Sequence, residues 1–245
     1  MKKRFLTILV VCLLASTYAF SQQEPGQNNE DLASAEAGNQ SSGLPKFLVG
    51  LNVGVGGCFS TMPSRYEEFV TWYDPQNADP KTKGVFVYQF AISGFYFFSD
   101  SLGLKFELGY ATFGSKQEKT WSNAEIYYKQ TDFNYIQIQV APTYRSRTMY
   151  LWLGLNFGIK MGTPKFELYD SFAYHIKGEI TKANSSFVGL TVGWGFMFKT
   201  GGVYFPFSVE FKYNFTTSGL NLPYGTDQNH RFYAVLVNLG ILFNL

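Results

Sequence analysis

The sequence predicts an all-β fold, and more narrowly an eight-stranded antiparallel up-and-down transmembrane β-barrel. Eight runs alternate large apolar residues with small or polar ones, which is the period of strands with two different faces. The connections between these runs are short and long in turn. Only 16% of the residues are charged, while 46% are hydrophobic and 19% aromatic, whereas a typical soluble domain carries about 25% charged residues. No run of about 18 apolar residues follows the N-terminus, which excludes a bundle of membrane-spanning helices.

The first four runs have a large apolar residue at every second position, and they lie at 47–55, 86–96, 104–110 and 135–144. In the first run, leucine and valine alternate with glycine and asparagine. The second run sets Phe90 on the face opposite Gln89, and the fourth run also has glutamine on its second face. The third run places Lys105 and Glu107 opposite its apolar residues.

The last four runs repeat the pattern, and they lie at 151–161, 188–199, 205–215 and 233–244. The second face of the fifth run mixes glycine with Trp152 and Asn156 and ends in Lys160, and that of the sixth run is mostly glycine and ends in Lys199. The seventh run sets phenylalanines against Glu210 and Lys212, and the eighth sets aliphatic residues against Asn238. Every run therefore has one face of large apolar residues and one face of mainly small or polar residues.

The connections predict how the strands are joined. Tight turns are expected at 99–101, 145–147 and 200–202, and long polar loops at 59–84, 115–132, 163–186 and 216–230. An even number of strands with turns at one end and loops at the other is typical of an up-and-down barrel.

The two faces predict which side meets lipid. Eight strands leave an interior just wide enough for side chains, so the small and polar face points inward and the apolar face outward. The alternative, a soluble sandwich or lipocalin-like barrel, has the opposite arrangement. Aromatic residues near strand ends are expected to form interfacial girdles; they are Phe47, Phe98, Tyr110, Tyr144, Tyr150, Phe215, Tyr233 and Phe243.

Residues 1–21 are predicted to be a cleaved secretory signal peptide. A basic start is followed by an apolar segment from Phe5 to Ala15, with cleavage expected after Ala19 or Ser21. Removing the three basic residues changes the formal charge from +2 to -1. A buried N-terminal helix and a lipoprotein anchored at Cys12 are the alternatives.

Residues 22–45 are predicted to form a disordered acidic periplasmic tail. This segment has no aromatic residue and carries a charge of -4, so it has too little apolar surface to fold. The remaining residues, 46–245, form the predicted barrel with a charge of about +3, too weakly basic for a nucleic-acid partner. Cys58 is the one thiol left after cleavage, so no internal disulfide and no cysteine metal site is expected.

Three strands resemble those of small outer-membrane β-barrel domains of the PorT-like and OmpX/OmpW-like kind. YIQIQVAPTY at 135–144 resembles the family strand YLEIPLLLKY, VEFKYNF at 209–215 resembles LELRYNYG, and LGLKFELGY at 102–110 resembles the third strand. The proline at Pro142 falls late in its strand, and a glycine is missing after Phe215. The resemblance implies a Gram-negative outer membrane and insertion by the barrel-assembly machinery, and most members of the family have no known enzymatic activity.

Charged residues on the inward face are the first candidate site, a lumen network of Lys105, Glu107, Lys160, Lys199, Glu210 and Lys212. A mutually compensated charge ladder that fills the barrel is one interpretation, since an unpaired buried charge is costly. A narrow path for ions is the other.

An enzyme that modifies lipid A would need a histidine with a serine or carboxylate partner. His175 and His230 both lie in predicted loops, with Ser171 and Asp227 nearby in sequence. No such pair falls on a lipid-facing strand, so we predict that the chain is not an enzyme and has no cofactor or metal.

Aromatic residues of the long loops are the second candidate site, with contacts expected from Trp72, Tyr73, Trp121, Tyr127, Tyr169 and Tyr174. Exposed aromatics on a rigid scaffold are common in binding surfaces; the alternative is that the strands extend and these rings pack together. We predict a structural or surface-interaction role in the outer membrane, with membrane lipids and an extracellular ligand or host surface as partners. The runner-up is a narrow channel or an OmpW-like conduit for small hydrophobic molecules, lined by inward apolar residues such as Phe113 and Leu242.

Overall fold

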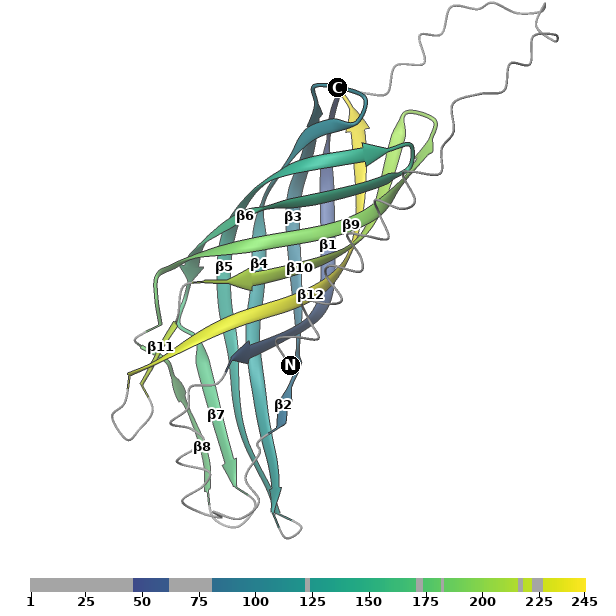
Figure 1. The fold of residues 1–245 in the computed structure, drawn as a ribbon. Helices are drawn as coiled ribbons and strands as arrows, with labels where there is room; N and C mark the ends of the chain where they lie inside the picture. The colour runs from purple at the N-terminus through teal and green to yellow at the C-terminus, as the bar shows by residue number, and fades with distance from the viewer. Residues whose placement is uncertain are drawn as a thin grey trace, which may run out of the picture. The chain divides into compact units, whose positions relative to one another are not determined.

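The structure is a computed structural model, and it describes residues 46–61, 81–121, 124–170, 174–181, 183–215, 218–221 and 227–245. These residues contain twelve β-strands (Figure 1). No helix in the described part of the chain is long and apolar enough to cross a membrane.

Eight strands form a closed antiparallel barrel: β1 (Phe47–Thr61), β3 (Val85–Phe97), β4 (Leu102–Trp121), β5 (Ala124–Ser146), β6 (Met149–Met161), β9 (Ser186–Thr200), β10 (Val203–Asn214) and β12 (Asp227–Asn244). Each barrel strand pairs with the next one along the chain, and β1 pairs with β12 to close the ring. Closure leaves no free sheet edge inside a bilayer, where every backbone polar group must find a partner. The predicted fold class and strand number are confirmed.

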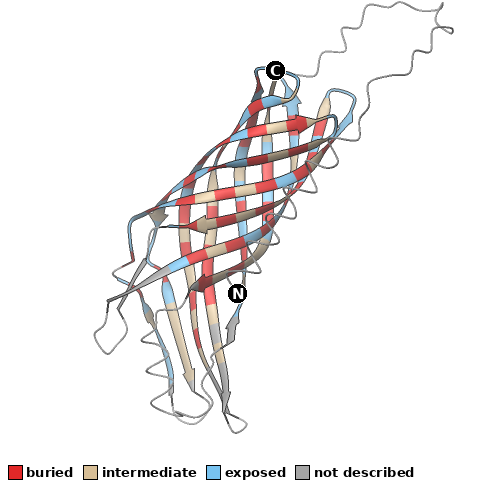
Figure 2. Cartoon of the chain, viewed as in Figure 1, coloured by how far each residue is buried: buried red, intermediate tan, exposed pale blue. Residues whose placement is uncertain are grey.

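The outer face of the barrel is apolar on all eight strands. Each strand contributes an exposed large hydrophobic residue, among them Leu51, Phe86, Leu108, Ile138, Leu153, Trp194, Phe205 and Leu239. The exposed fractions of Leu51 and Phe86 are 66% and 70%. Buried and exposed residues alternate along the strands in Figure 2. An apolar belt of this extent is typical of a transmembrane barrel and excludes the lipocalin-like alternative.

The inner face admits large side chains because glycine lies beside them. A Cβ on Gly193 would collide with the ring of Trp152 on the neighbouring strand β6, and a Cβ on Gly158 would collide with the ring of Phe187 on β9. Tyr150 is also buried inside, stacked at 5.4 Å between ring centroids on Trp152. Its predicted place in an outer aromatic girdle is therefore wrong, because it shares the inward parity of Trp152.

The two ends of the barrel differ. Short turns at 98–101, 147–148 and 201–202 mark one end, here the turn end. Arg147 and Gly201 have φ values of 49° and 60°, which fit the left-handed geometry of tight turns. The opposite end, here the hairpin end, carries strands that run beyond the barrel wall.

These additional strands form a sheet extension on β4 and β5. β2 (Lys81–Lys83) pairs with β4, β7 (Lys165–Asp170) pairs with β5, and β8 (Tyr174–Glu179) pairs with β7. β11 (Ser218–Asn221) pairs separately with β12. The predicted loop at 115–132 is wrong, because β4 and β5 continue as a hairpin to Trp121 and Ala124.

A bulge explains why the alternation did not reveal this hairpin. Phe113 pairs with Phe133, but the next inward residue of β4, Ser115, pairs with Gln130. Two residues of β5 thus oppose one of β4, and Asp132 takes a φ of 63°. On β5 the inward residues therefore have even numbers before the bulge and odd numbers after it, so the period-two pattern breaks there.

Candidate functional site

The lumen is filled in three layers. At the turn end an aromatic layer contains Phe95, Phe97, Tyr150, Trp152 and Tyr204. At the hairpin end a second apolar layer contains Phe113, Phe133, Tyr135, Phe187, Phe232 and Leu236. Between them lies a belt of buried polar and charged residues. The inward apolar residues that were candidates for lining a route instead fill the two ends.

The hairpin-end layer is completed by the connection between β8 and β9. Ile180 and Ala183 of this connection are buried against the aromatic rings of the layer. Lys160 donates a hydrogen bond of 2.7 Å to the carbonyl oxygen of Ala183. Part of the predicted loop at 163–186 therefore packs into the mouth of the barrel.

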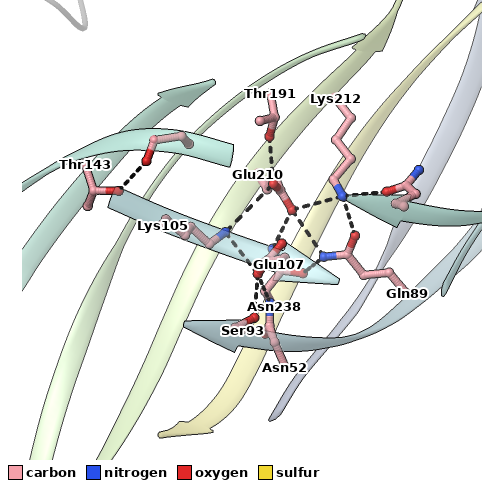
Figure 3. Close-up of polar contacts among 12 residues, drawn as sticks. Asn52, Gln89, Ser93, Lys105, Glu107, Thr143, Thr191, Glu210, Lys212 and Asn238 are labelled. Carbon is pink, nitrogen blue, oxygen red and sulfur yellow. Dashed lines mark hydrogen bonds and ion pairs between the residues drawn. The ribbon is translucent and has the colours of Figure 1, made fainter. Parts of the chain in front are cut away.

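Glu210 of β10 is the centre of the polar belt (Figure 3). Its carboxylate accepts a hydrogen bond of 2.7 Å from the Thr191 hydroxyl and further hydrogen bonds from Gln89 and Asn238, at 3.2 and 3.3 Å. The ammonium group of Lys212 lies 3.7 Å from the same carboxylate. Lys212 also donates hydrogen bonds of 2.7 and 3.0 Å to the amide oxygens of Gln89 and Gln137.

Glu107 of β4 is the second carboxylate of the belt. It accepts hydrogen bonds from Ser93 at 2.7 Å and from Asn52 at 2.9 Å. The ammonium group of Lys105 lies 3.1 Å from Glu107 and 4.0 Å from Glu210, so it links the two carboxylates. It also lies 3.9 Å from the centroid of the Trp152 ring, at the border of the turn-end layer.

Four of the six predicted lumen charges therefore meet, and two do not. Lys105, Glu107, Glu210 and Lys212 are all at most 5% exposed and their formal charges cancel. Lys160 lies at the hairpin end, and Lys199 is exposed at the turn end, 5.6 Å from the Tyr204 ring. A pocket in the belt, lined by Gln89, Glu107 and Lys212 among others, has a volume of about 10 Å³, room for about one water molecule. Fixed, neutralised and tightly packed charges are suited to holding a barrel together.

Sequence reasoning did not single out the neutral members of this belt or Arg145. Asn52, Gln89, Ser93, Thr191 and Asn238 stand at inward positions, so strand parity was the signal that could have found them. Arg145 was assigned to a turn, but it is 3% exposed at the turn end. Its guanidinium carbon lies 3.6 Å from the centroid of the Phe97 ring.

The sheet extension carries the aromatic candidates that the structure describes. The rings of Tyr127 and Tyr169 stack at 5.0 Å between centroids, across the β5–β7 pair. Trp121 ends β4 and Tyr174 begins β8, but their side chains lie outside the described residues, as do Trp72 and Tyr73 entirely. Tyr127 and Tyr169 therefore pack on each other on extended strands, and a role of these rings in binding a partner stays a prediction.

His175 belongs to the same surface. Its Nε2 lies 2.7 Å from Oε1 of Glu167, and the ring also contacts Tyr169. The hydrogen bond with His175 and the charge of Lys177 hold the pKa of Glu167 below its ordinary value. His230 pairs through its backbone with Ser218, and its side chain lies outside the description. Among the described residues, no three His, Cys, Asp or Glu side chains gather in a way that could hold a metal.

The barrel wall is interrupted between β3 and β4 at the hairpin end. Their ladder runs from Phe97–Gly103 to Gln89–Ala111 and stops there. At the next position both the backbone N–H and the carbonyl oxygen of Tyr88 bond to the Thr112 hydroxyl, at 3.1 and 3.3 Å. An open groove of about 480 Å³ lies over this gap, and Phe86, Tyr88, Phe113, Lys116 and Lys129 are among its lining residues.

Comparisons with known proteins give similar solved structures but no family. No family model matches the chain, and no curated protein matches it. Solved structures similar to it include Ail, the attachment invasion locus protein of Yersinia pestis, with the heparin analogue sucrose octasulfate (10% identity, 81% of this chain and 99% of that one, TM-score 0.38). Others are OprG of Pseudomonas aeruginosa (12%, 81% and 95%, 0.40) and the protease OmpT of Escherichia coli (9%, 81% and 96%, 0.40). The assignment to the barrel class rests on the strand pairing above.

Proposed function

We propose that this chain is an integral outer-membrane barrel protein with a structural or surface-interaction role, in which the barrel is a closed scaffold. The observation that carries the proposal is the filled lumen. Two aromatic layers close the ends, and four buried charges compensate one another between them. With the interior occupied, the surface left for interaction is the outer face and the sheet extension at the hairpin end.

The outer-membrane location is supported by the apolar belt together with the predicted signal peptide at 1–21 and the acidic tail at 22–45. A chain exported in this way would be inserted by the barrel-assembly machinery, as the PorT-like resemblance implies. In this arrangement the turn end faces the periplasm and the hairpin end faces outward, since short periplasmic and long extracellular connections are the rule.

Extraction of the outer membrane followed by electrophoresis with and without boiling tests this location. We expect the protein in the detergent-soluble membrane fraction, with a faster unboiled band because the closed barrel resists denaturation. A freely soluble protein with one band in both lanes would contradict the proposal.

A conduit for small hydrophobic molecules is the second candidate, and the interrupted β3–β4 wall favours it. The groove over the gap reaches Phe113 of the hairpin-end layer. Passage would require this layer to move, because its rings pack closely; the centroids of the Phe113 and Phe232 rings, for example, are 6.3 Å apart. Liposomes that take up a hydrophobic dye, and lose the uptake when Tyr88→Cys and Thr112→Cys are joined by a disulfide, would support the conduit over the closed scaffold.

The proposed role involves no catalysis. His175 lies on the exposed extension with Glu167 and Tyr169 as its partners, and no serine is among its contacts in the described residues. Mass spectra of lipid A from cells with and without the protein test this point. We expect identical spectra; a changed acyl or phosphate pattern would show lipid modification.

A further inference from the structure

A row of lysines crosses the outward face of the sheet extension. Backbone pairing places Lys83 beside Lys116, Lys116 beside Lys129, Lys129 beside Glu167, and Glu167 beside Lys177. Five strands thus present four cations and one carboxylate side by side. Like charges directly opposite each other on a sheet are unfavourable, so the row needs further anions around it.

Carboxylates of the extension provide part of this compensation. Glu118 lies 2.6 Å from Lys83 and 3.1 Å from Lys116, and these lysines hold its pKa below the ordinary value. Glu167 lies 3.4 Å from Lys177. Lys129, in the middle of the row, has no ion pair with any described residue. One cation of the row is therefore left for an external anion.

Lys129 stands between two hollows of the outer surface. The groove of about 480 Å³ over the β3–β4 gap is lined by Lys116 and Lys129 with one carboxylate, Asp132, which is paired with Lys165 at 3.2 Å. A second pocket of about 330 Å³ has three lysines, Lys129, Lys165 and Lys177, against two carboxylates, Glu167 and Glu179. A bound anion at Lys129 would thus have a second lysine within the same pocket on either side. Phosphate groups suit such a site, because ammonium groups bind them through charge-assisted hydrogen bonds.

The groove also has an apolar half. Phe86 is 70% exposed and Tyr88 37% exposed, and both line the groove together with the lysines. Tyr88 contacts the rings of Phe90 and Tyr110, which continue the apolar belt of the barrel wall. A molecule bound in the groove would therefore contact apolar rings on one side, and on the other side two lysines and the carboxylate of Asp132.

We propose that this groove binds a phosphorylated glycolipid of the outer leaflet, with a phosphate at Lys116 and Lys129 and an acyl chain against Phe86 and Tyr88. The inference rests on the proposed function, because it needs the hairpin end at the outer surface of the membrane. A soluble polyanion fits the lysines but leaves the exposed aromatic half unused. The lipid thereby becomes a fixed part of the interaction surface around the extension.

Native mass spectrometry of the full protein in neutral detergent tests the assignment. The probes are bisphosphorylated lipid A, the same lipid with its phosphates removed, a phosphorylated glycan without acyl chains, and inorganic phosphate. We expect the wild-type protein to retain the bisphosphorylated lipid at least tenfold more tightly than the other three. Equal retention with and without phosphates, or equal binding of the acyl-free glycan, would overturn the assignment.

Variants identify the groove as the site. Lys116→Gln with Lys129→Gln should weaken retention at least tenfold, and Phe86→Ala should weaken it severalfold. The matched control is Lys46→Gln with Lys199→Gln, two exposed lysines at the turn end, which should retain the lipid like the wild type. The single variant Lys129→Gln covers the case in which the double variant does not fold, because no ion pair within the described residues is lost. Unchanged retention in the folded Lys129 variant would refute the site.

Failure of this inference is distinguishable from failure of the proposed function. Each protein is also run on a gel with and without boiling. Folded variants that shift on boiling but retain the phosphorylated lipid like the wild type refute only the lipid site. A wild-type protein whose band does not shift on boiling refutes the membrane location itself.

Discussion

The polar belt of the lumen and the lysine row of the sheet extension use the same residue types in opposite ways. Inside, Lys105 and Lys212 are about 2% exposed, and each lies within 4 Å of a carboxylate. Outside, Lys129 is partly exposed and has no ion pair with the described residues. Burial makes an uncompensated charge expensive, so the inner charges must balance. Water and counter-ions relax that demand outside.

This difference assigns different roles to the two regions. A neutral, hydrogen-bonded belt between two aromatic layers fixes the barrel strands relative to one another. A surface with an excess of cations is instead suited to recruiting anions. The comparison predicts that charge changes inside the barrel alter stability, while charge changes on the extension alter binding.

The largest effect on the free energy of unfolding is expected from Glu210→Ala. The substitution removes three hydrogen bonds and two ion-pair contacts, and it leaves Lys105 and Lys212 without the carboxylate they share. We expect a loss of about 3–5 kcal/mol in the free energy of unfolding, the usual cost of breaking a buried ion pair. Guanidinium titration in detergent, followed by tryptophan fluorescence, measures it. The control is Glu179→Ala on the exposed face of β8; an equal effect of both variants would erase the distinction between inside and outside.

A double-mutant cycle sharpens the same point. Glu210→Gln and Lys212→Met each leave one charge unbalanced, whereas the double variant restores a neutral belt. We expect the double variant to be less destabilised than the sum of the two single variants, with a coupling of about 1–3 kcal/mol. Additive losses in the same titration would mean that the two groups do not act as a pair.

A smaller effect is expected at Glu167 when pH changes. Because its pKa is lowered, the contact with His175 and Lys177 is present at neutral pH and is lost as the pH falls through the lowered pKa. His175→Ala should move the pKa of Glu167 back up toward its ordinary value, while that of Glu118 stays where Lys83 and Lys116 hold it. Carbon NMR titration of the carboxylates in micelles measures both, and an unmoved Glu167 would show that the imidazole contact is absent in solution.

The smallest effect on stability is expected from Lys129→Gln. A surface substitution without a broken ion pair changes the free energy of unfolding by at most about 0.5 kcal/mol. The guanidinium midpoint should therefore match that of the wild type while retention of the phosphorylated lipid falls. A large shift of the midpoint would place Lys129 in the structural network instead.

The barrel strands and the direction of their faces could be predicted from the sequence because strand parity is a local property. Parity also identified Lys105, Glu107, Glu210 and Lys212 as inward charges. It could not identify Lys160 and Lys199 as outliers, because parity gives the direction of a side chain and not its height along the barrel. Height depends on the register between strands, which pairs Lys160 with Tyr135 and Lys199 with Tyr204, toward opposite ends.

The sequence left the sheet extension open as one of two alternatives, for a different reason. Its hairpin is polar, and the bulge at Asp132 interrupts the alternation that marks a strand. The lysine row is also a product of pairing, since its members are up to 94 residues apart, from Lys83 to Lys177. Only the register across five strands brings them together.

Single-channel recording of the wild-type protein in a planar lipid bilayer tests whether the lumen is closed and the function lies outside it. We expect a flat trace at all applied voltages after verified insertion of folded barrels. Stable conductance steps in the wild-type protein that disappear in a folded Glu107→Ala variant would contradict it, because they would show ions passing along the polar belt.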